Sequence, residues 1–229
     1  MSAPRTDGRP RLPRDFFARP STEVGPDLLG CVLWHDSPEG RVAVRLTEVE
    51  AYQGALDPAS HAYRGETKRN AVMFGEPGFA YVYFTYGMHF CVNLVCQPAG
   101  TPEAVLIRAG EVVAGIELAR KRRGASTDRD LARGPARLCQ ALAIDRAQDG
   151  ADACGPGSPL GFGPRAETAG PEPSVCRGPR IGISRAADRP WRYWLAGDGH
   201  VSSYRPSQPR VRRPRPDTGG EPEDGTMHR

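Results

Sequence analysis

Alternating apolar and polar positions predict most of the secondary structure in the first half of the chain. Two such runs, residues 31–35 and 41–49, are separated by five turn-forming residues, a pattern that predicts a β-hairpin. A second hairpin is expected from residues 79–85 and 89–96, with Gly87 supplying the positive φ of the turn. Further strands are expected at residues 103–109, 180–184 and 191–196.

Segments with helical spacing are fewer and shorter. They comprise residues 21–29, 67–74, 111–123 and 135–142. In the third of these, Val112, Ile116 and Ala119 are expected to face inward. Together the elements predict an α+β fold with a mostly antiparallel sheet and few helices.

The two ends of the chain lack this patterning. Residues 1–12 and 205–229 consist largely of Pro, Gly and charged residues, which cannot bury enough apolar surface to offset the entropy of ordering, so we expect both to be disordered. The remaining residues 13–204 suit one domain, since the whole chain has only 229 residues. Within it, the Gly- and Pro-rich residues 145–178 are expected to form a long surface excursion.

Charge and cysteine usage narrow the setting. A net charge of +4 permits a nucleic-acid partner without identifying one. The basic clusters at residues 120–123 and 210–215 are, taken alone, typical of solvated surface. None of the six cysteines forms a C-x-x-C pair, and no run resembles a signal peptide or a membrane span. We therefore expect a protein of the reducing cytoplasm with free thiols and no membrane partner.

Residues 47–61, T-E-V-E-A-Y-Q-G-A-L-D-P-A-S-H, bring several chemically useful groups to the end of a predicted strand. Glu50 could act there as a general base on water. Glu48 is a rival, because strand alternation puts both carboxylates on the face of Val42 and Leu46. An isolated loop glutamate is more often an ordinary surface residue, so a catalytic role for Glu50 needs support from the residues around it.

The clustering of tyrosines favours a functional role for this region of the chain. Five of the seven fall between residues 52 and 86. Tyr81 is interpreted as an ordinary sheet residue. Tyr86 lies near the expected hairpin tip, where it is poorly placed for a core and could serve as the wedge that unstacks a base step. Tyr52 and Tyr83 could then sandwich an extruded base.

Three other polar residues are candidates. His61 could donate a hydrogen bond to a base or bind a metal, although no histidine lies in a spacing typical of a zinc site. Arg108 ends an apolar run and could anchor a carboxylate or a phosphate. Asn93, inside another apolar run, is either a member of a buried polar network or a selectivity element.

The chain resembles the mammalian-type alkyladenine (3-methyladenine) DNA glycosylases, a family that also has bacterial members. The matching segments are T-E-V-E-A-Y, D-P-A-S-H, T-K-R-N-A-V-M-F, P-G-F-A-Y-V-Y-F-T-Y-G-M-H-F-C-V-N, A-V-L-I-R-A, G-P-A-R-L-C-Q-A-L-A-I and R-I-G-I-S. The resemblance implies a single α+β domain around a curved antiparallel sheet, with peripheral helices and a hairpin that enters the minor groove. It implies a bacterial enzyme of the cytosol or nucleoid, monomeric and without a cofactor, that acts on double-stranded DNA containing damaged purines.

The resemblance also implies a hydrolytic mechanism. Glu50 matches the residue that activates water for attack at C1′, and Arg108 matches the arginine that helps to hold this water. The target nucleotide must first be flipped out of the duplex, as is general for glycosylases. Because Lys68, Lys121 and the N-terminus are the only amines available for a Schiff base, we predict a monofunctional enzyme without a lyase step.

The remaining candidates match residues of the base pocket and the DNA wedge. Tyr52, His61 and Tyr83 match residues that line the pocket by stacking and hydrogen bonding. Tyr86 matches the side chain that fills the gap left by the flipped nucleotide, and Asn93 matches the residue whose bulk discourages the exocyclic amino group of normal guanine. Two other functions stay open from the residues alone: a nucleic-acid-binding module without activity, and a metal-dependent hydrolase.

Overall fold

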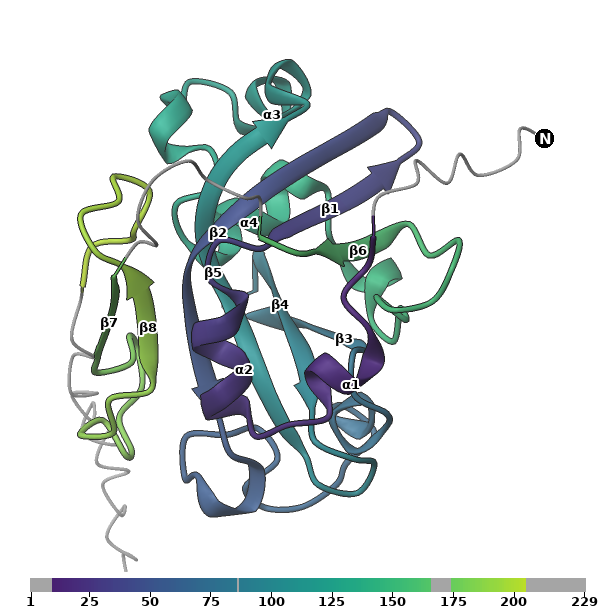
Figure 1. Ribbon diagram of the computed structural model, residues 1–229, viewed down its shortest axis with the longest axis vertical. Helices are drawn as coiled ribbons and strands as arrows, with labels where there is room; N and C mark the ends of the chain where they lie inside the picture. Colours follow the sequence, from purple (N-terminus) through teal and green to yellow (C-terminus); the bar gives the residue numbers. More distant parts are fainter. Residues whose placement is uncertain (1–9, 86, 166–173, 205–229) are drawn as a thin grey trace, which may run out of the picture.

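The computed structural model describes residues 10–85, 87–165 and 174–204, which form one body around an eight-stranded sheet. The strands are β1 (Val32–Ser37), β2 (Gly40–Tyr52), β3 (Ala80–Thr85), β4 (His89–Cys96), β5 (Glu103–Ala114), β6 (Leu160–Gly163), β7 (Val175–Gly178) and β8 (Arg192–Leu195). Their order is β3-β4-β5-β2-β1-β6, with β8 paired to β2 and β7 to β8, and each of these pairs is antiparallel. The sheet curls around the core (Figure 1), which confirms the expected α+β class.

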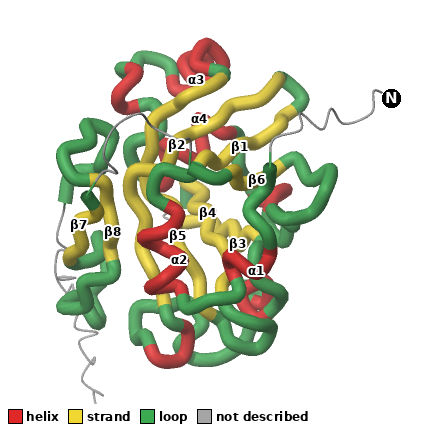
Figure 2. The backbone as a smooth tube through the Cα atoms, viewed as in Figure 1, coloured by secondary structure: helices red, strands yellow, loops and turns green. Residues whose placement is uncertain are grey.

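The helices lie around this sheet (Figure 2), as expected. The α-helices of the described residues are α1 (Arg14–Phe17), α2 (Ser21–Leu28), α3 (Ile116–Arg123) and α4 (Pro135–Leu142). Helix α2 packs on β2 and β5, and α4 packs on β4 and β5. Their apolar residues join those of β1, β2, β4 and β5 in the main core, for example Leu28, Leu46, Ile107 and Leu138.

The two predicted hairpins are confirmed. Strands β1 and β2 pair from Val32 with Arg45 to Ser37 with Gly40, so their turn is shorter than the five residues expected. Strands β3 and β4 pair from Ala80 with Leu94 to Thr85 with His89, and Gly87 between them has φ 69°. Tyr86, the expected wedge, lies outside the described residues.

The expected helix at 111–123 is shorter in the structure, because its first four residues belong to strand β5. Residues 111–114 continue β5, where Val112 pairs with Val44. Helix α3 begins only after Gly115, whose φ is 71° and where a Cβ atom would lie 2.2 Å from the Arg41 carbonyl oxygen. The close approach of the β2 backbone therefore sets the start of the helix.

Two shorter expectations are also wrong. The run 67–74 forms only the 3₁₀ helix Ala71–Phe74, because the Asn70 amide oxygen accepts hydrogen bonds from both the backbone and the hydroxyl of Thr67. Residues 180–184 are irregular rather than a strand, with φ 75° at Gly182.

The chain segments expected to lack structure are partly ordered. Residues 145–178 supply β6 and β7, although 166–173 lie outside the described residues. Leu12 donates its amide proton to the Phe162 carbonyl oxygen at 2.7 Å, so order begins before the predicted boundary at residue 13. The rest of the predicted terminal disorder, at 1–9 and 205–229, lies outside the described residues.

Candidate active site

A cavity of about 490 Å³ opens where β2, β3, β4 and β5 come together. Five of the predicted site residues line it: Tyr52, His61, Tyr83, Asn93 and Arg108. Glu50 is fully buried directly beside this lining, in contact with Tyr52 and Arg108. The structure thus brings together six of the seven residues expected from the sequence, and the seventh, Tyr86, lies outside the described residues.

A bulge in β2 places Glu50 on the same face as Tyr52, which lines the cavity. The register of β2 against β5 shifts on either side of Glu48. Leu46 belongs to the main core before the shift, and Val49 and Ala51 belong to it afterwards. The even-numbered positions therefore change faces, as a bulge requires. The expectation that Glu48 and Glu50 share a face with Leu46 is wrong for this reason.

Glu48 is fully committed to structural contacts. Its carboxylate accepts hydrogen bonds from Arg108 Nε at 3.0 Å, from Arg192 Nε at 2.7 Å, and from the Ser202 amide and hydroxyl at 2.7 and 3.0 Å. Burial alone would raise the pKa of Glu48, but the charge of Arg108 and the Ser202 hydrogen bonds outweigh it and lower the pKa. A carboxylate that accepts four hydrogen bonds is a poor general base, which leaves Glu50 as the better candidate of the two glutamates.

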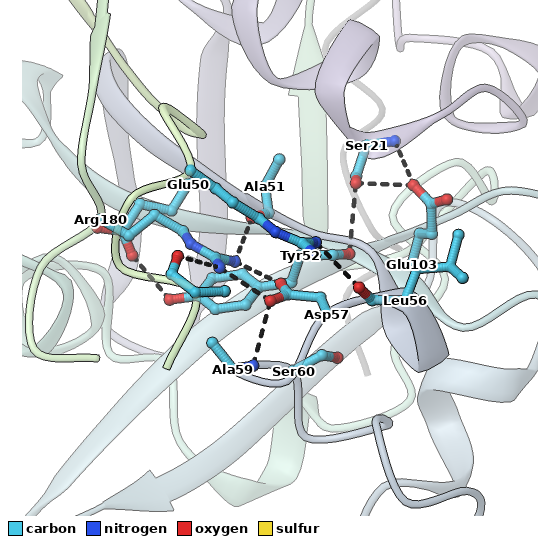
Figure 3. Close-up of polar contacts among 12 residues, drawn as sticks. Ser21, Glu50, Ala51, Tyr52, Leu56, Asp57, Ala59, Ser60, Glu103 and Arg180 are labelled. Atoms are coloured by element: carbon cyan, nitrogen blue, oxygen red, sulfur yellow. Dashed lines mark hydrogen bonds and ion pairs between the residues drawn. The ribbon is translucent and has the colours of Figure 1, made fainter. Parts of the chain in front are cut away.

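The Glu50 carboxylate has fewer polar contacts than that of Glu48, and its partners line the cavity. Its Oε2 accepts the Tyr52 hydroxyl proton at 2.8 Å, and its Oε1 accepts the Ile181 amide proton at 2.7 Å (Figure 3 shows the Tyr52 contact). Arg108 Nη1 lies 3.2 Å from the same Oε1. These donors fix the carboxylate without occupying every lone pair.

Arg108 is positioned by the two carboxylates on either side of it. It is almost fully buried on β5, and its guanidinium contacts Glu48 and Glu50. Burial would lower the pKa of Arg108, yet the charges of Glu50 and Glu48 outweigh this and raise it. Arg108 therefore remains a fixed cation at the cavity wall.

His61 enters the cavity as a neutral ring. Its Nδ1 lies 3.1 Å from the Tyr81 hydroxyl, and its ring meets the Tyr83 ring edge-on at a centroid distance of 4.5 Å. Burial and the charge of Arg69 lower the pKa of His61, so the imidazole is uncharged at neutral pH. Tyr81, interpreted from the sequence as an ordinary sheet residue, is thus a partner of His61 as well as a member of the cavity wall.

The side-chain amide of Asn93, on β4, is held by a hydrogen bond to the neighbouring strand β3. Its Nδ2 donates to the Tyr81 carbonyl oxygen at 3.1 Å, and its side chain also lines the cavity. Both interpretations of Asn93, network member and selectivity element, are compatible with this position. Cys91 lines the cavity beside Tyr83, and burial raises the pKa of the Cys91 thiol, so this thiol is protonated at neutral pH.

Sequence reasoning missed the contribution of residues 180–185. Ile181, Gly182, Ile183, Ser184 and Arg185 line the cavity. The Ile181 amide reaches Glu50, and Arg180 packs its guanidinium over the Tyr52 ring. The R-I-G-I-S motif was visible, but its interpretation as a strand gave no reason to place it beside Glu50.

The described residues contain neither a candidate metal site nor a helix that could span a membrane. No three His, Cys, Asp or Glu side chains there are grouped closely enough to ligate a metal ion. In the same residues, every helix is too short or too polar to span a bilayer.

Comparisons with known proteins identify the family of the chain. A profile of the methylpurine-DNA glycosylase (MPG) family matches residues 15–199. A Streptomyces avermitilis protein is 56% identical over 208 residues, covering 90% of this chain and 97% of its own, and a Frankia casuarinae protein is 52% identical over 217 residues, covering 92% and 99%. Both carry the name "Putative 3-methyladenine DNA glycosylase". With most of its length matched and its carboxylate, arginine and aromatic residues gathered at one cavity, the chain belongs to the methylpurine-DNA glycosylase family.

Proposed function

We propose that this chain is a monofunctional DNA repair glycosylase that releases 3-methyladenine and related alkylated or deaminated purines from double-stranded DNA, leaving an abasic site. The observation that carries the proposal is the Glu50 carboxylate, buried beside the cavity and fixed by Tyr52, Ile181 and Arg108. An oriented carboxylate beside a cavity of about 490 Å³ can act on a water molecule next to an extruded nucleotide.

Glu50 is assigned the role of general base. It takes one proton from water as the oxygen bonds to C1′ of the flipped nucleotide. The N-glycosidic bond breaks, and its electron pair leaves with the purine. Alkylation at N3 or N7 already places positive charge on the base, so an alkylated purine leaves as a neutral molecule. Hypoxanthine carries no such charge, so it leaves as an anion and takes up one proton from solvent. The Arg108 guanidinium, 3.2 Å from Glu50, can hold the attacking water in line.

The cavity walls are suited to a flat purine. Tyr52, His61 and Tyr83 offer rings, and stacking on an aromatic ring contributes about 1–3 kcal/mol per base. Burial and the Glu50 charge raise the pKa of Tyr52 well above its ordinary value, while burial and neighbouring Cys91 raise that of Tyr83. Both tyrosines therefore stay neutral, and their faces attract a cationic base.

The Tyr81 hydroxyl is proposed to set the His61 tautomer. The Arg69 guanidinium lies near enough to the Tyr81 hydroxyl to affect its pKa, and an arginine can only donate. The Tyr81 proton is then free to bind His61 Nδ1, 3.1 Å away. The ring proton of His61 is left on Nε2, as a donor to a purine nitrogen. The rigid amide of Asn93 is proposed to exclude the amino group of normal guanine.

The absence of a cavity lysine supports the monofunctional assignment. Among the described residues that line the cavity, none is a lysine. A lyase step through a Schiff base would need such an amine. Lys121 lies on α3 and contacts Glu39, away from this wall.

The test is base release from oligonucleotides that carry one lesion each. Glu50→Gln should abolish the release of 3-methyladenine and hypoxanthine while binding to lesion DNA survives. Glu111→Gln is the matched control, since Glu111 also lies next to an arginine, Arg45, but outside the cavity. Full activity of Glu50→Gln would refute the proposal. Binding without any release by the wild type would favour a non-enzymatic module, and loss of activity with EDTA would favour a metal-dependent hydrolase.

A further inference from the structure

Arg180 and Asp57 form an ion pair that is closed off from solvent. Neither side chain has any exposed surface. Arg180 Nη2 donates to Asp57 Oδ1 at 2.9 Å and Nη1 donates to Oδ2, so the guanidinium and carboxylate meet as two parallel forks (Figure 3).

The pair joins three separate parts of the chain. Arg180 Nη1 also donates to the Ala51 carbonyl oxygen at 2.9 Å, near the end of β2. Asp57 belongs to the loop that follows β2, and Arg180 begins the irregular segment 180–185. No strand pairing joins the loop to the segment in the described residues: turns and bends follow Asp57, and bends and turns follow Arg180.

Both joined segments form walls of the cavity. Pro58, Ala59, Ser60 and His61 line it from the loop, directly after Asp57. Ile181 to Arg185 line it from the other segment, directly after Arg180. Neither Arg180 nor Asp57 is itself part of the lining. Each member of the pair therefore directly precedes, in the sequence, a segment that lines the cavity.

Arg180 also adjoins two of the three groups that hold Glu50, Tyr52 and Ile181. Its guanidinium carbon lies 4.5 Å from the centre of the Tyr52 ring, so it covers one face of that ring and leaves the other for a base. The next residue, Ile181, donates its amide proton to Glu50 Oε1 at 2.7 Å. A shift of Arg180 would move both the stacking ring and the amide donor.

Stability alone is a weak reason for such a pair. Desolvating two charges offsets much of their attraction, and a well-packed apolar pair of similar volume is often equally stable. Arg180 Nε is in addition buried without a hydrogen-bond partner in the described part of the chain, which is a further cost. The geometry that the pair imposes is the better explanation for its presence.

We propose that Arg180 and Asp57 are positioning residues for base excision, which hold Tyr52 and the Ile181 amide against Glu50 and fix the distance between the two cavity walls. They touch neither the base nor the water. This inference rests on the proposed glycosylase function.

The test separates the excision rate from DNA binding. In the double variant Arg180→Met/Asp57→Leu both charges are removed, so no unpaired charge is buried and the fold is retained. Its single-turnover rate of base release should fall roughly tenfold to a hundredfold, as expected for a small misplacement of reacting groups. Its affinity for DNA with an uncleavable abasic-site analogue should match the wild type. Arg180→Lys, which keeps the charge but loses the fork, should lose rate in the same way.

Arg189→Met is the control. Arg189 donates to the Leu56 carbonyl oxygen at 2.9 Å and stacks on Trp191, so it contacts the same loop from the exposed side without reaching Asp57. It should keep the wild-type rate. A wild-type rate in the double variant or in Arg180→Lys would overturn the inference, as would an equal loss in Arg189→Met. If the wild type itself released no base, the proposed function would fail instead.

Discussion

The Tyr52 hydroxyl donates to Glu50 Oε2 at 2.8 Å, between two residues that share a face of β2 because they are two positions apart. Burial and the Glu50 charge keep the pKa of Tyr52 well above its ordinary value, so the hydroxyl is a permanent donor. Under the proposed function, this one side chain would stack on the base through its ring and orient the carboxylate through its hydroxyl.

Tyr52→Phe should separate the two roles. The ring that stacks and the packing on Arg180 are retained, while one hydrogen bond to a charged acceptor is lost. Such bonds contribute about 1.5–3 kcal/mol, so the single-turnover rate of excision should fall about tenfold to a hundredfold. Affinity for DNA with an abasic-site analogue should not change. An unaltered rate would show that Ile181 and Arg108 suffice to orient Glu50.

Glu48→Gln should act mainly on stability. Glu48 is buried against both Arg108 and Arg192, and removing one partner of a buried charge cluster costs about 3–5 kcal/mol. We expect the free energy of unfolding, measured by urea denaturation, to fall by about this amount. Glu50→Gln, which leaves Arg192 paired, should lose activity with a smaller loss of stability. Equal losses for the two variants would contradict this division of roles.

The sequence predicted both hairpins, and six of the seven residues that it proposed for the site lie close together, but it did not predict the faces on which they lie. Alternation along β2 could not reveal the bulge at Glu48, because the inserted residue is set by pairing with β5. Local sequence patterns also could not place Arg180, because its partner Asp57 is 123 positions away in the chain. Helix α3 was expected too early because Val112 and Val113 fit either period, and only the approach of Arg41 to Gly115 fixes the boundary.

The stability of the fold should decline as pH falls below about 6.5, the ordinary pKa of histidine. Burial lowers the pKa of both His35 and His61, with added effects from Arg122 and Arg69. Both rings are neutral in the folded state at pH 7, and the unfolded chain binds protons first as the pH falls. Stability is therefore complete above pH 6.5 and is lost as the pH drops through the folded-state pKa values.

His35→Gln isolates one part of this effect. His35 Nδ1 lies 2.7 Å from the Leu142 carbonyl oxygen, outside the cavity. The variant should be less stable than the wild type at pH 7, yet its free energy of unfolding should change less between pH 7 and pH 5. Thermal denaturation across this range gives the comparison. A slope as steep as that of the wild type would assign the effect to other groups.

Asn93→Ser should relax discrimination against guanine. Asn93 is held in the cavity wall by its bond to the Tyr81 carbonyl oxygen, and the shorter serine would leave room for an exocyclic amino group. We expect slow release of guanine from undamaged DNA to increase relative to hypoxanthine, by about tenfold if the clash removed is worth 1.4 kcal/mol. Chromatography of the released bases measures the ratio. An unchanged ratio would leave Asn93 as a structural residue only.

Three of the four basic residues at the end of α3 are paired with acidic side chains. Arg120 pairs with Glu117 and, at 2.7 Å, with Asp128, while Lys121 and Arg122 both reach Glu39. Glu39 lies in the β1–β2 turn, at the opposite end of β2 from Tyr52 (Figure 1). Charges that are paired locally and lie away from the cavity contribute little to a DNA interface.

Salt dependence should distinguish this cluster from the C-terminal one. Each phosphate contact that is lost reduces the slope of log affinity against log salt by about 0.9. Deleting residues 205–229, which carry Arg210, Arg212, Arg213 and Arg215, should therefore flatten the slope for undamaged duplex DNA, with little effect on single-turnover excision. Lys121→Ala should leave the slope unchanged, because Lys121 already has Glu39 as its counterion. Fluorescence anisotropy between low and physiological salt gives both slopes. An unchanged slope after the deletion would show that the C-terminal arginines do not contact DNA.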